Sequence, residues 1–165
     1  MKKYEFTGET KEIRLLFRTA TLHRIRATVA FGIVEVGDLG GWIEKEENLS
    51  HEGKAWVCGD AKVWGNAKVC GDAKVWGNAK VFSASHVLVI GAIGSRNDFT
   101  TFYRDKDNEI TVKCGCFLGK IDRFLEKVTQ THGDSKYALV YRAAVEVAKL
   151  QIDLSGEAPK DADEE

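Results

Sequence analysis

The stretch CGDAKVWGNAKV occupies residues 58–69 and recurs without a gap at residues 70–81. Each block holds two six-residue units of the form Gly-Asp/Asn-Ala-Lys-Val-x, and a fixed short period indicates one structural step that repeats. Within Ala61-Lys62-Val63-Trp64, small, charged, branched and aromatic residues alternate, which predicts a short strand with Ala and Val on one face. Gly followed by Asp or Asn tolerates the positive φ of a sharp turn, so we expect a corner every six residues.

The inward-facing positions continue at steps of six beyond the two blocks. One series consists of branched or aromatic residues, and the second consists of small residues: Val57, Val63, Val69, Val75, Val81, Val87, Ile93 and Phe99, then Ala55, Ala61, Ala67, Ala73, Ala79, Ser85 and Gly91. This pattern is similar to the hexapeptide-repeat family, whose fold is a left-handed parallel β-helix with three units in each coil. The resemblance implies that Val57 stacks on Val75 and Val63 on Val81. An array of antiparallel hairpins is the alternative, but strands this short would hold little core.

The predicted fold class is therefore mainly β, with a left-handed parallel β-helix over residues 43–98. We expect an N-terminal β cap over residues 1–42 and a C-terminal ββαα module over residues 99–152. The module should contain a hairpin, a helix from about Ile121 and a second helix that carries Tyr137 and Tyr141. Residues 153–165 contain six acidic residues and the only proline of the chain, which predicts a disordered acidic tail. The apolar stretch at residues 13–21 allows more than one conformation.

The composition of the chain limits the cellular compartment and the classes of binding partner that we expect for it. The formal net charge is −1, with 24 basic and 25 acidic residues, which does not favour binding to duplex nucleic acid. The four cysteines lack the spacing of a disulfide framework, and we find no signal-peptide pattern or apolar run of membrane length. We therefore predict a cytoplasmic protein of the host cell without a membrane partner. Cys114 and Cys116 would need two further ligands to hold zinc, so we expect no metal.

Apolar residues also occupy outward positions of the repeat, where a solvated surface would carry polar groups. Exposed aromatic rows usually mark an interface, and the predicted interface residues are Trp64, Trp76, Phe82 and Leu88. The three-fold packing that the hexapeptide resemblance implies favours a homotrimer or a multiple of three. Alternatively, these side chains lie flat beneath the terminal segments.

A polar loop follows the repeats and suggests a ligand site. Arg96 can grip a phosphate or carboxylate with its fork of donors, while nearby Gly and Ser amides approach the same anion. The predicted ligand-binding residues are Ser95, Arg96, Asn97, Asp98, Thr100, Thr101, Tyr103 and Arg104. In a trimer the loop would face a groove between protomers, where Trp76 or Phe82 could stack on a flat ring. The alternative is a polar end-cap in which Arg96 forms a salt bridge.

The chain from KYEFTGET (3–10) through GDLGGWIEKEENLS (37–50) and IGSRNDFTTFYR (93–104) to VKCGCF (112–117) and THGDSKYA (131–138) resembles a group of small hexapeptide-repeat proteins of phages and prophages. The resemblance implies phage origin but little chemistry. Our leading hypothesis is a non-enzymatic oligomer without a cofactor. It would capture a small anionic ligand, such as a nucleotide, between protomers and sequester a host defence signal.

Two other functions remain open from the sequence. Hexapeptide acyltransferases use a histidine as general base toward a coenzyme A thioester, and the chain offers His51, His86 and His132. We assign no catalytic residue because none of the three has an obvious Asp or Glu orienter at helical or strand spacing. The third hypothesis is an inhibitor that blocks a host protein through the aromatic outer face.

Overall fold

The computed structural model describes residues 1–157 and 160–162. Within these residues the strands form three separate sheets, and two α-helices cover the last of them. The five-stranded sheet has the order β1-β2-β3-β5-β7, the two-stranded sheet is β4-β6, and the four-stranded sheet has the order β11-β10-β9-β8. The strands and helices are β1 (Tyr4–Arg14), β2 (Thr19–Ala27), β3 (Leu39–Ile43), β4 (Trp56–Val57), β5 (Lys62–Val63), β6 (Lys74–Val75), β7 (Lys80–Val81), β8 (Val87–Ile93), β9 (Asp98–Arg104), β10 (Ile110–Cys114), β11 (Phe117–Lys120), α1 (Ile121–His132) and α2 (Lys136–Gln151).

The predicted fold class, a mainly β left-handed parallel β-helix, is wrong. The fold is mixed α/β, and its longer strands pair antiparallel: β1 with β2, β8 with β9, and β9 with β10. Parallel pairing joins β3 and the two-residue strands β4 to β7, and one isolated parallel bridge joins Leu49 to Val69. The physical reason lies in the repeat itself, because its strands β4 to β7 are only two residues long and contribute too little pairing to set the architecture of the whole chain. The flanking segments lack the corners of the repeat and form the longer hairpins.

Inside the repeat, the stacking register expected for the two valine pairs is confirmed. Val57 pairs with Val75 and Val63 with Val81, each in a parallel ladder. The corners have the expected backbone, since Gly59 and Gly71 adopt φ of 67° and 65°. The register ends after β7: Val87 and Ile93, which we expected to continue the inward series, lie in β8 and pair with Tyr103 and Asp98 of β9.

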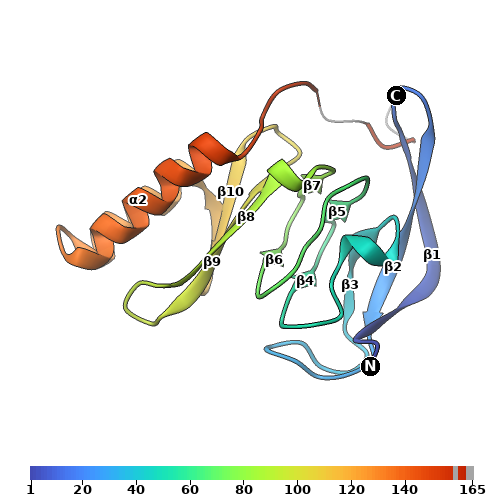
Figure 1. Ribbon diagram of the computed structural model, residues 1–165, viewed down its shortest axis with the longest axis horizontal. Coiled ribbons are helices and arrows are strands. Elements are labelled where there is room, and N and C mark those ends of the chain that lie inside the picture. The colour runs from blue at the N-terminus through green and yellow to red at the C-terminus, as the bar shows by residue number, and fades with distance from the viewer. Residues whose placement is uncertain (158–159, 163–165) are drawn as a thin grey trace.

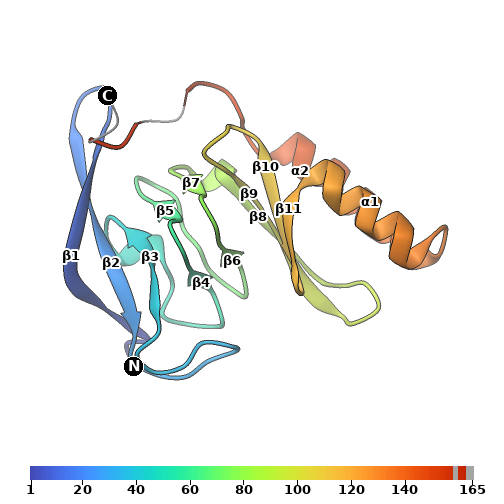
Figure 2. The same cartoon turned by 180° about the vertical axis from the view of Figure 1, so that it is seen from behind.

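The C-terminal module follows the sequence prediction more closely. The hairpin of β9 and β10 and the two helices occur where we expected them. One face of the β8–β11 sheet packs on the helices through a core that contains Phe102, Phe124 and Val145. The other face packs on the repeat, where Tyr103 joins the valine core. β9 is therefore covered on both faces, and the sheet lies between the repeat and the helices (Figures 1 and 2).

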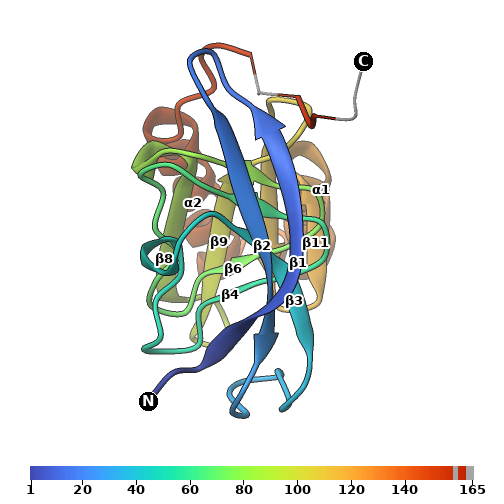
Figure 3. The same cartoon turned by 90° about the vertical axis from the view of Figure 1, so that its right-hand side faces the viewer.

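The N-terminal hairpin lies at the opposite end of the molecule from the helices (Figures 1 and 2), and it therefore stands in front in the end-on view of Figure 3. The stretch at residues 13–21 forms the tip of this hairpin, where the Leu15 N–H donates to the Arg18 carbonyl at 2.8 Å. Asp161, in the segment expected to be a disordered tail, bridges to Ile13 of β1. Residues 158–159 and 163–165 of that predicted tail lie outside the described residues. None of the described helices is long and apolar enough to cross a membrane.

Candidate functional site

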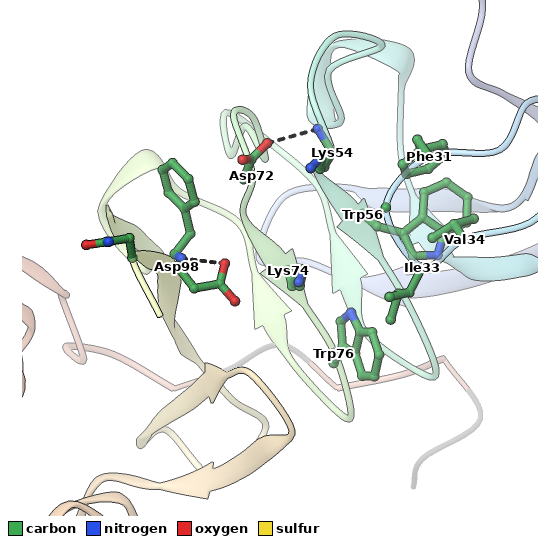
Figure 4. Close-up of a pocket in the computed structure, with 12 residues that line it drawn as sticks. Phe31, Ile33, Val34, Lys54, Trp56, Asp72, Lys74, Trp76 and Asp98 are labelled. Atoms are coloured by element: carbon green, nitrogen blue, oxygen red, sulfur yellow. Dashed lines mark hydrogen bonds between the residues drawn. The ribbon is translucent and has the colours of Figure 1, made fainter. Parts of the chain in front are cut away.

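A pocket of about 340 Å³ opens where three separate parts of the chain meet. The loop between β2 and β3 forms one side, the two-stranded β4-β6 sheet forms the floor, and the turn between β8 and β9 forms the other side. Figure 4 shows Lys74 in the middle, with Asp98 on one side and Trp56 and Trp76 on the other. The lining residues are Phe31, Gly32, Ile33, Val34, Lys54, Trp56, Asp72, Lys74, Trp76, Asn97, Asp98 and Phe99. We call this the tryptophan pocket.

Aromatic side chains give the tryptophan pocket an apolar wall. Phe31 packs edge-to-face on Trp56, with ring centroids 5.3 Å apart. Trp76 is half-buried, and the Lys113 ammonium lies 4.4 Å from the centroid of its ring. The indole Nε1 of Trp76 is buried and has no hydrogen-bond partner among the described residues. An indole N–H is a donor only, and this one is closed off from solvent.

Two lysines bring positive charge to the tryptophan pocket. The ammonium groups of Lys54 and Lys74 form no ion pair or hydrogen bond with any described residue. The pocket also holds two carboxylates, but both accept backbone hydrogen bonds: Asp72 from the Lys54 N–H at 3.1 Å and Asp98 from the Phe99 N–H at 2.7 Å. Burial and the charge of Lys74 lower the pKa of Lys113, whose ammonium lies over the Trp76 ring. The pocket thus combines two ammonium groups that have no partner among the described residues with two carboxylates that each accept one backbone hydrogen bond.

The predicted ligand-binding residues do not gather in one site. Asn97 and Asp98 line the tryptophan pocket, whereas Ser95, Arg96 and Asp98 line a second pocket of about 190 Å³ against α1 and α2. The turn between β8 and β9 thus separates two hollows.

The other four predicted residues are buried within β9 and bonded to the protein. Thr101 accepts the Lys74 N–H at 3.0 Å, Tyr103 donates to the Trp76 carbonyl at 2.8 Å, Thr100 donates to the Cys114 sulfur at 3.3 Å, and Arg104 donates to the carbonyls of Ser155 and Gly156. They face packed neighbours because β9 is covered on both faces. The expectation that they contact a ligand is corrected for Thr100, Thr101, Tyr103 and Arg104.

The expected row of exposed aromatic residues is also corrected. Trp64 is 2% exposed and stacks on Phe82, with ring centroids 4.9 Å apart, beneath the N-terminal hairpin. Phe82 is half-buried, and Leu88 packs on the helix core. The terminal segments cover these side chains, as the alternative interpretation held. Of the four predicted interface residues, Trp76 lines the tryptophan pocket.

None of the three histidines that the acyltransferase hypothesis needs lines the tryptophan pocket. His86 is 2% exposed, and its two ring nitrogens lie 3.2 Å from the Phe82 N–H and from the Arg104 guanidinium. Burial and the Arg104 charge lower the pKa of His86 to about 4. His51 accepts the Lys3 N–H and stacks on Tyr4. His132 lines the smaller pocket, where its ring stacks on that of Tyr141.

Among the described residues, no group of three or more His, Cys, Asp or Glu side chains is arranged to hold a metal ion. Cys114 and Cys116 both line the smaller pocket together with Arg96. Comparison with protein-family models and with curated proteins finds no match for this chain.

Sequence reasoning missed most of the tryptophan pocket. It identified Trp76 as a ring that could stack on a ligand, and it placed Asn97 and Asp98 at the site. Phe31, Lys54 and Trp56 were not predicted. No local sequence pattern could predict them, because their meeting depends on tertiary packing. The loop after β2 joins the pocket only because β3 extends the sheet of the repeat.

Proposed function

We propose that this protein is a non-enzymatic binding protein that captures a small anionic ligand with a planar ring, such as a nucleotide, in the tryptophan pocket. The observation that carries the proposal is the pairing of an aromatic wall with two uncommitted ammonium groups, those of Lys54 and Lys74. An aromatic face stacks on a flat ring, while lysine attracts phosphate as a point charge.

The size and the chemistry of the pocket support this ligand class. Small-molecule pockets span about 300–1,000 Å³, and this pocket lies near the lower end of that range. One ring with one charged group therefore suits it better than a long substrate. Its half-buried ring, Trp76, offers an aromatic surface against which a flat ligand ring can pack.

The distribution of acid–base groups supports capture rather than catalysis. A general base must reach the proton that it removes. The pocket carboxylates accept backbone hydrogen bonds, and no histidine lines the pocket. His86, the histidine of the repeat, is enclosed by Phe82 and Arg104.

The proposal includes a biological role, which rests on the resemblance to phage and prophage proteins. A phage protein that captures a nucleotide would sequester a host defence signal.

Titration calorimetry with AMP, GMP, CMP and UMP tests the proposal. We expect at least one of them to bind, and to bind more tightly than its nucleoside or inorganic phosphate alone. Lys74→Met should weaken that binding by at least about tenfold, because a desolvated charge contact is lost. Lys68→Met is the matched control, because Lys68 occupies the same position of its six-residue unit as Lys74 but is exposed and lies outside the pocket.

The failure of all four nucleotides at millimolar concentration would reject a nucleotide as the ligand. Equal affinity of the wild type and Lys74→Met would show that the anion binds elsewhere.

A further inference from the structure

Two lysines lie next to each other on the outer face of the five-stranded sheet. Lys62 of β5 pairs with Lys80 of β7 in a parallel ladder, so the two side chains point to the same side. Both are buried, with exposed fractions of 7% and 8%. Two ammonium groups buried side by side lose hydration and repel each other, so the arrangement is stable only with an anion nearby. We call these two residues the lysine pair.

A carboxylate from the C-terminal part of the chain supplies that anion. The Asp161 carboxylate lies 3.0 Å from the Lys62 ammonium and 3.8 Å from the Lys80 ammonium. We call residues 160–162 the tail segment. It lies beside the N-terminal hairpin, at the opposite end of the molecule from α2 (Figures 1 and 2). The anion thus comes from a segment that is distant in sequence from both lysines.

The backbone of the tail segment pairs with the edge of β1. The Arg14 N–H donates to the Lys160 carbonyl at 3.2 Å, and the Ala162 N–H donates to the Glu12 carbonyl at 3.1 Å. β1 is an edge strand of the five-stranded sheet, and addition of an extended peptide to such an edge is a common mode of protein recognition. The β1 edge and the lysine pair therefore combine backbone pairing with a contact for a carboxylate.

Different forces hold this site and the tail segment. Ile13 of β1 belongs to one buried cluster with Trp42 of β3 and Trp64, so the apolar core places the β1 edge near the lysine pair. The tail segment belongs to none of the three apolar clusters and is held by backbone hydrogen bonds and charge. Segments with few buried apolar contacts open at a lower free energy than the core. We therefore expect the site to persist when the tail segment detaches.

We propose that the β1 edge and the lysine pair form a binding site for an acidic, extended peptide of a partner protein, and that the tail segment competes with this peptide. The peptide must carry a carboxylate at the position of Asp161, because this group meets both lysines. The neighbouring positions contribute backbone groups and tolerate many side chains. Neither lysine lines the tryptophan pocket, so peptide binding and ligand capture are separable.

Fluorescence anisotropy of a labelled peptide with the sequence of residues 155–165 tests this inference on the whole chain. The wild type should bind the peptide weakly, because its own tail segment occupies the site. Asp161→Lys in the protein replaces the competing carboxylate with a cation that the lysine pair repels. This variant should bind the peptide at least about tenfold more tightly than the wild type, because charge-assisted contacts become available to the peptide.

A second substitution in the Asp161→Lys protein locates the binding site. Lys62→Met should weaken peptide binding by at least about tenfold, because the nearer cation is lost. Lys68→Met is the matched control, since Lys68 is exposed and occupies the same position of its six-residue unit. It should leave the affinity for the peptide unchanged.

The milder variant Asp161→Asn provides an independent test in case Asp161→Lys fails to fold, which near-ultraviolet circular dichroism would reveal. Asp161→Asn should also bind the peptide more tightly than the wild type, by a smaller factor. Equal affinity of the wild type and the folded Asp161 variants would overturn the inference, and so would a lack of binding to all of them. Equal losses from Lys62→Met and Lys68→Met would place the peptide elsewhere and overturn it as well.

Discussion

Residues 58–69 and residues 70–81 have the same sequence but different surroundings. Trp64 of the first block is buried beneath the N-terminal hairpin and stacks on Phe82. Trp76, its counterpart in the second block, is half-buried and lines the tryptophan pocket. The same indole thus stabilises the core in one block and forms the wall of a candidate ligand site in the other.

The lysines of the two blocks differ in the same way. Lys62 of the first block is buried, and its ammonium lies 3.0 Å from the Asp161 carboxylate. Lys74, at the equivalent position, faces the pocket without an ion pair among the described residues. The local sequence determines the short strand and the corner, whereas the segments that pack on each block determine what its side chains do. Four sets of measurements test whether the surroundings of each block determine what its side chains do.

The largest expected effect separates the two tryptophans. Trp64→Ala removes a fully packed ring, and such substitutions cost about 3–5 kcal/mol in the free energy of unfolding. Trp76→Ala should cost clearly less, because its ring is partly exposed, and it should abolish nucleotide binding instead. Urea denaturation of both variants measures the difference. Equal losses of stability would show that the two rings have equivalent environments.

The free energy of unfolding should depend on pH through His86, which lies in the cluster of rings around Trp64. Phe82, which stacks on Trp64, also contacts His86, with ring centroids 4.3 Å apart. The folded pKa of His86 is about 4, against an ordinary value of 6.5. The unfolded chain therefore binds a proton between pH 6.5 and 4 that the folded chain does not bind. Stability should fall as the pH decreases through this window, by up to about 1.4 kcal/mol per pH unit.

The groups that face His86 are the Arg104 guanidinium, which lowers its pKa, and the Asp153 carboxylate, which raises it. The control variant is His86→Gln, which does not titrate. Its free energy of unfolding should vary less with pH than that of the wild type between pH 6.5 and 4. Parallel curves for the two proteins would contradict a depressed pKa in the folded state.

A smaller effect is expected for the two lysines. Lys62→Met leaves the Asp161 carboxylate without its nearer cation, although Lys80 remains 3.8 Å away. We expect a loss of about 1–2 kcal/mol, in the range for a partly buried charged group that loses a partner. Lys74→Met should leave stability nearly unchanged. Thermal unfolding at low and high salt measures both, and an equal effect of the two substitutions would remove the distinction.

The smallest effect concerns the first residue of each block. Cys58 is half-buried and Cys70 is exposed, and burial raises the pKa of the Cys58 thiol. The thiolate is the reactive form, so a maleimide should label Cys70 faster than Cys58. Mass spectrometry of a labelling time course on the native protein gives both rates. Faster labelling of Cys58 would indicate that the N-terminal segment does not cover the first block.

The parts of the fold that sequence predicted are those in which neighbours in the chain are also neighbours in space. The period of six gave the corners at Gly59 and Gly71 and the parallel register of Val57 with Val75. Helical spacing gave α1 and α2. The overall class failed because Val87 and Ile93 fit the same period but pair with β9, and a two-residue strand offers little resistance to such a change of partner.

The candidate site was harder to predict because it depends on contacts between distant segments. Phe31 and Trp56 are brought together by packing of the loop after β2, which no local pattern encodes. Arg104 appeared available from its sequence, yet β9 lies between two cores, and its guanidinium is buried against Ser155 and Gly156. A pattern assigns residues to the faces of a strand, but tertiary packing decides whether a face meets solvent or protein.

The most direct test of the account is a two-dimensional proton–nitrogen spectrum of the four tryptophan indoles, recorded while the nucleotide that calorimetry identifies is added. Conservative substitution of each tryptophan assigns the four signals. We predict that the signals of Trp56 and Trp76 shift with ligand concentration, whereas those of Trp42 and Trp64 stay in place. Movement of the Trp64 signal with an unmoved Trp76 signal would contradict the assignment of the ligand site to the second block.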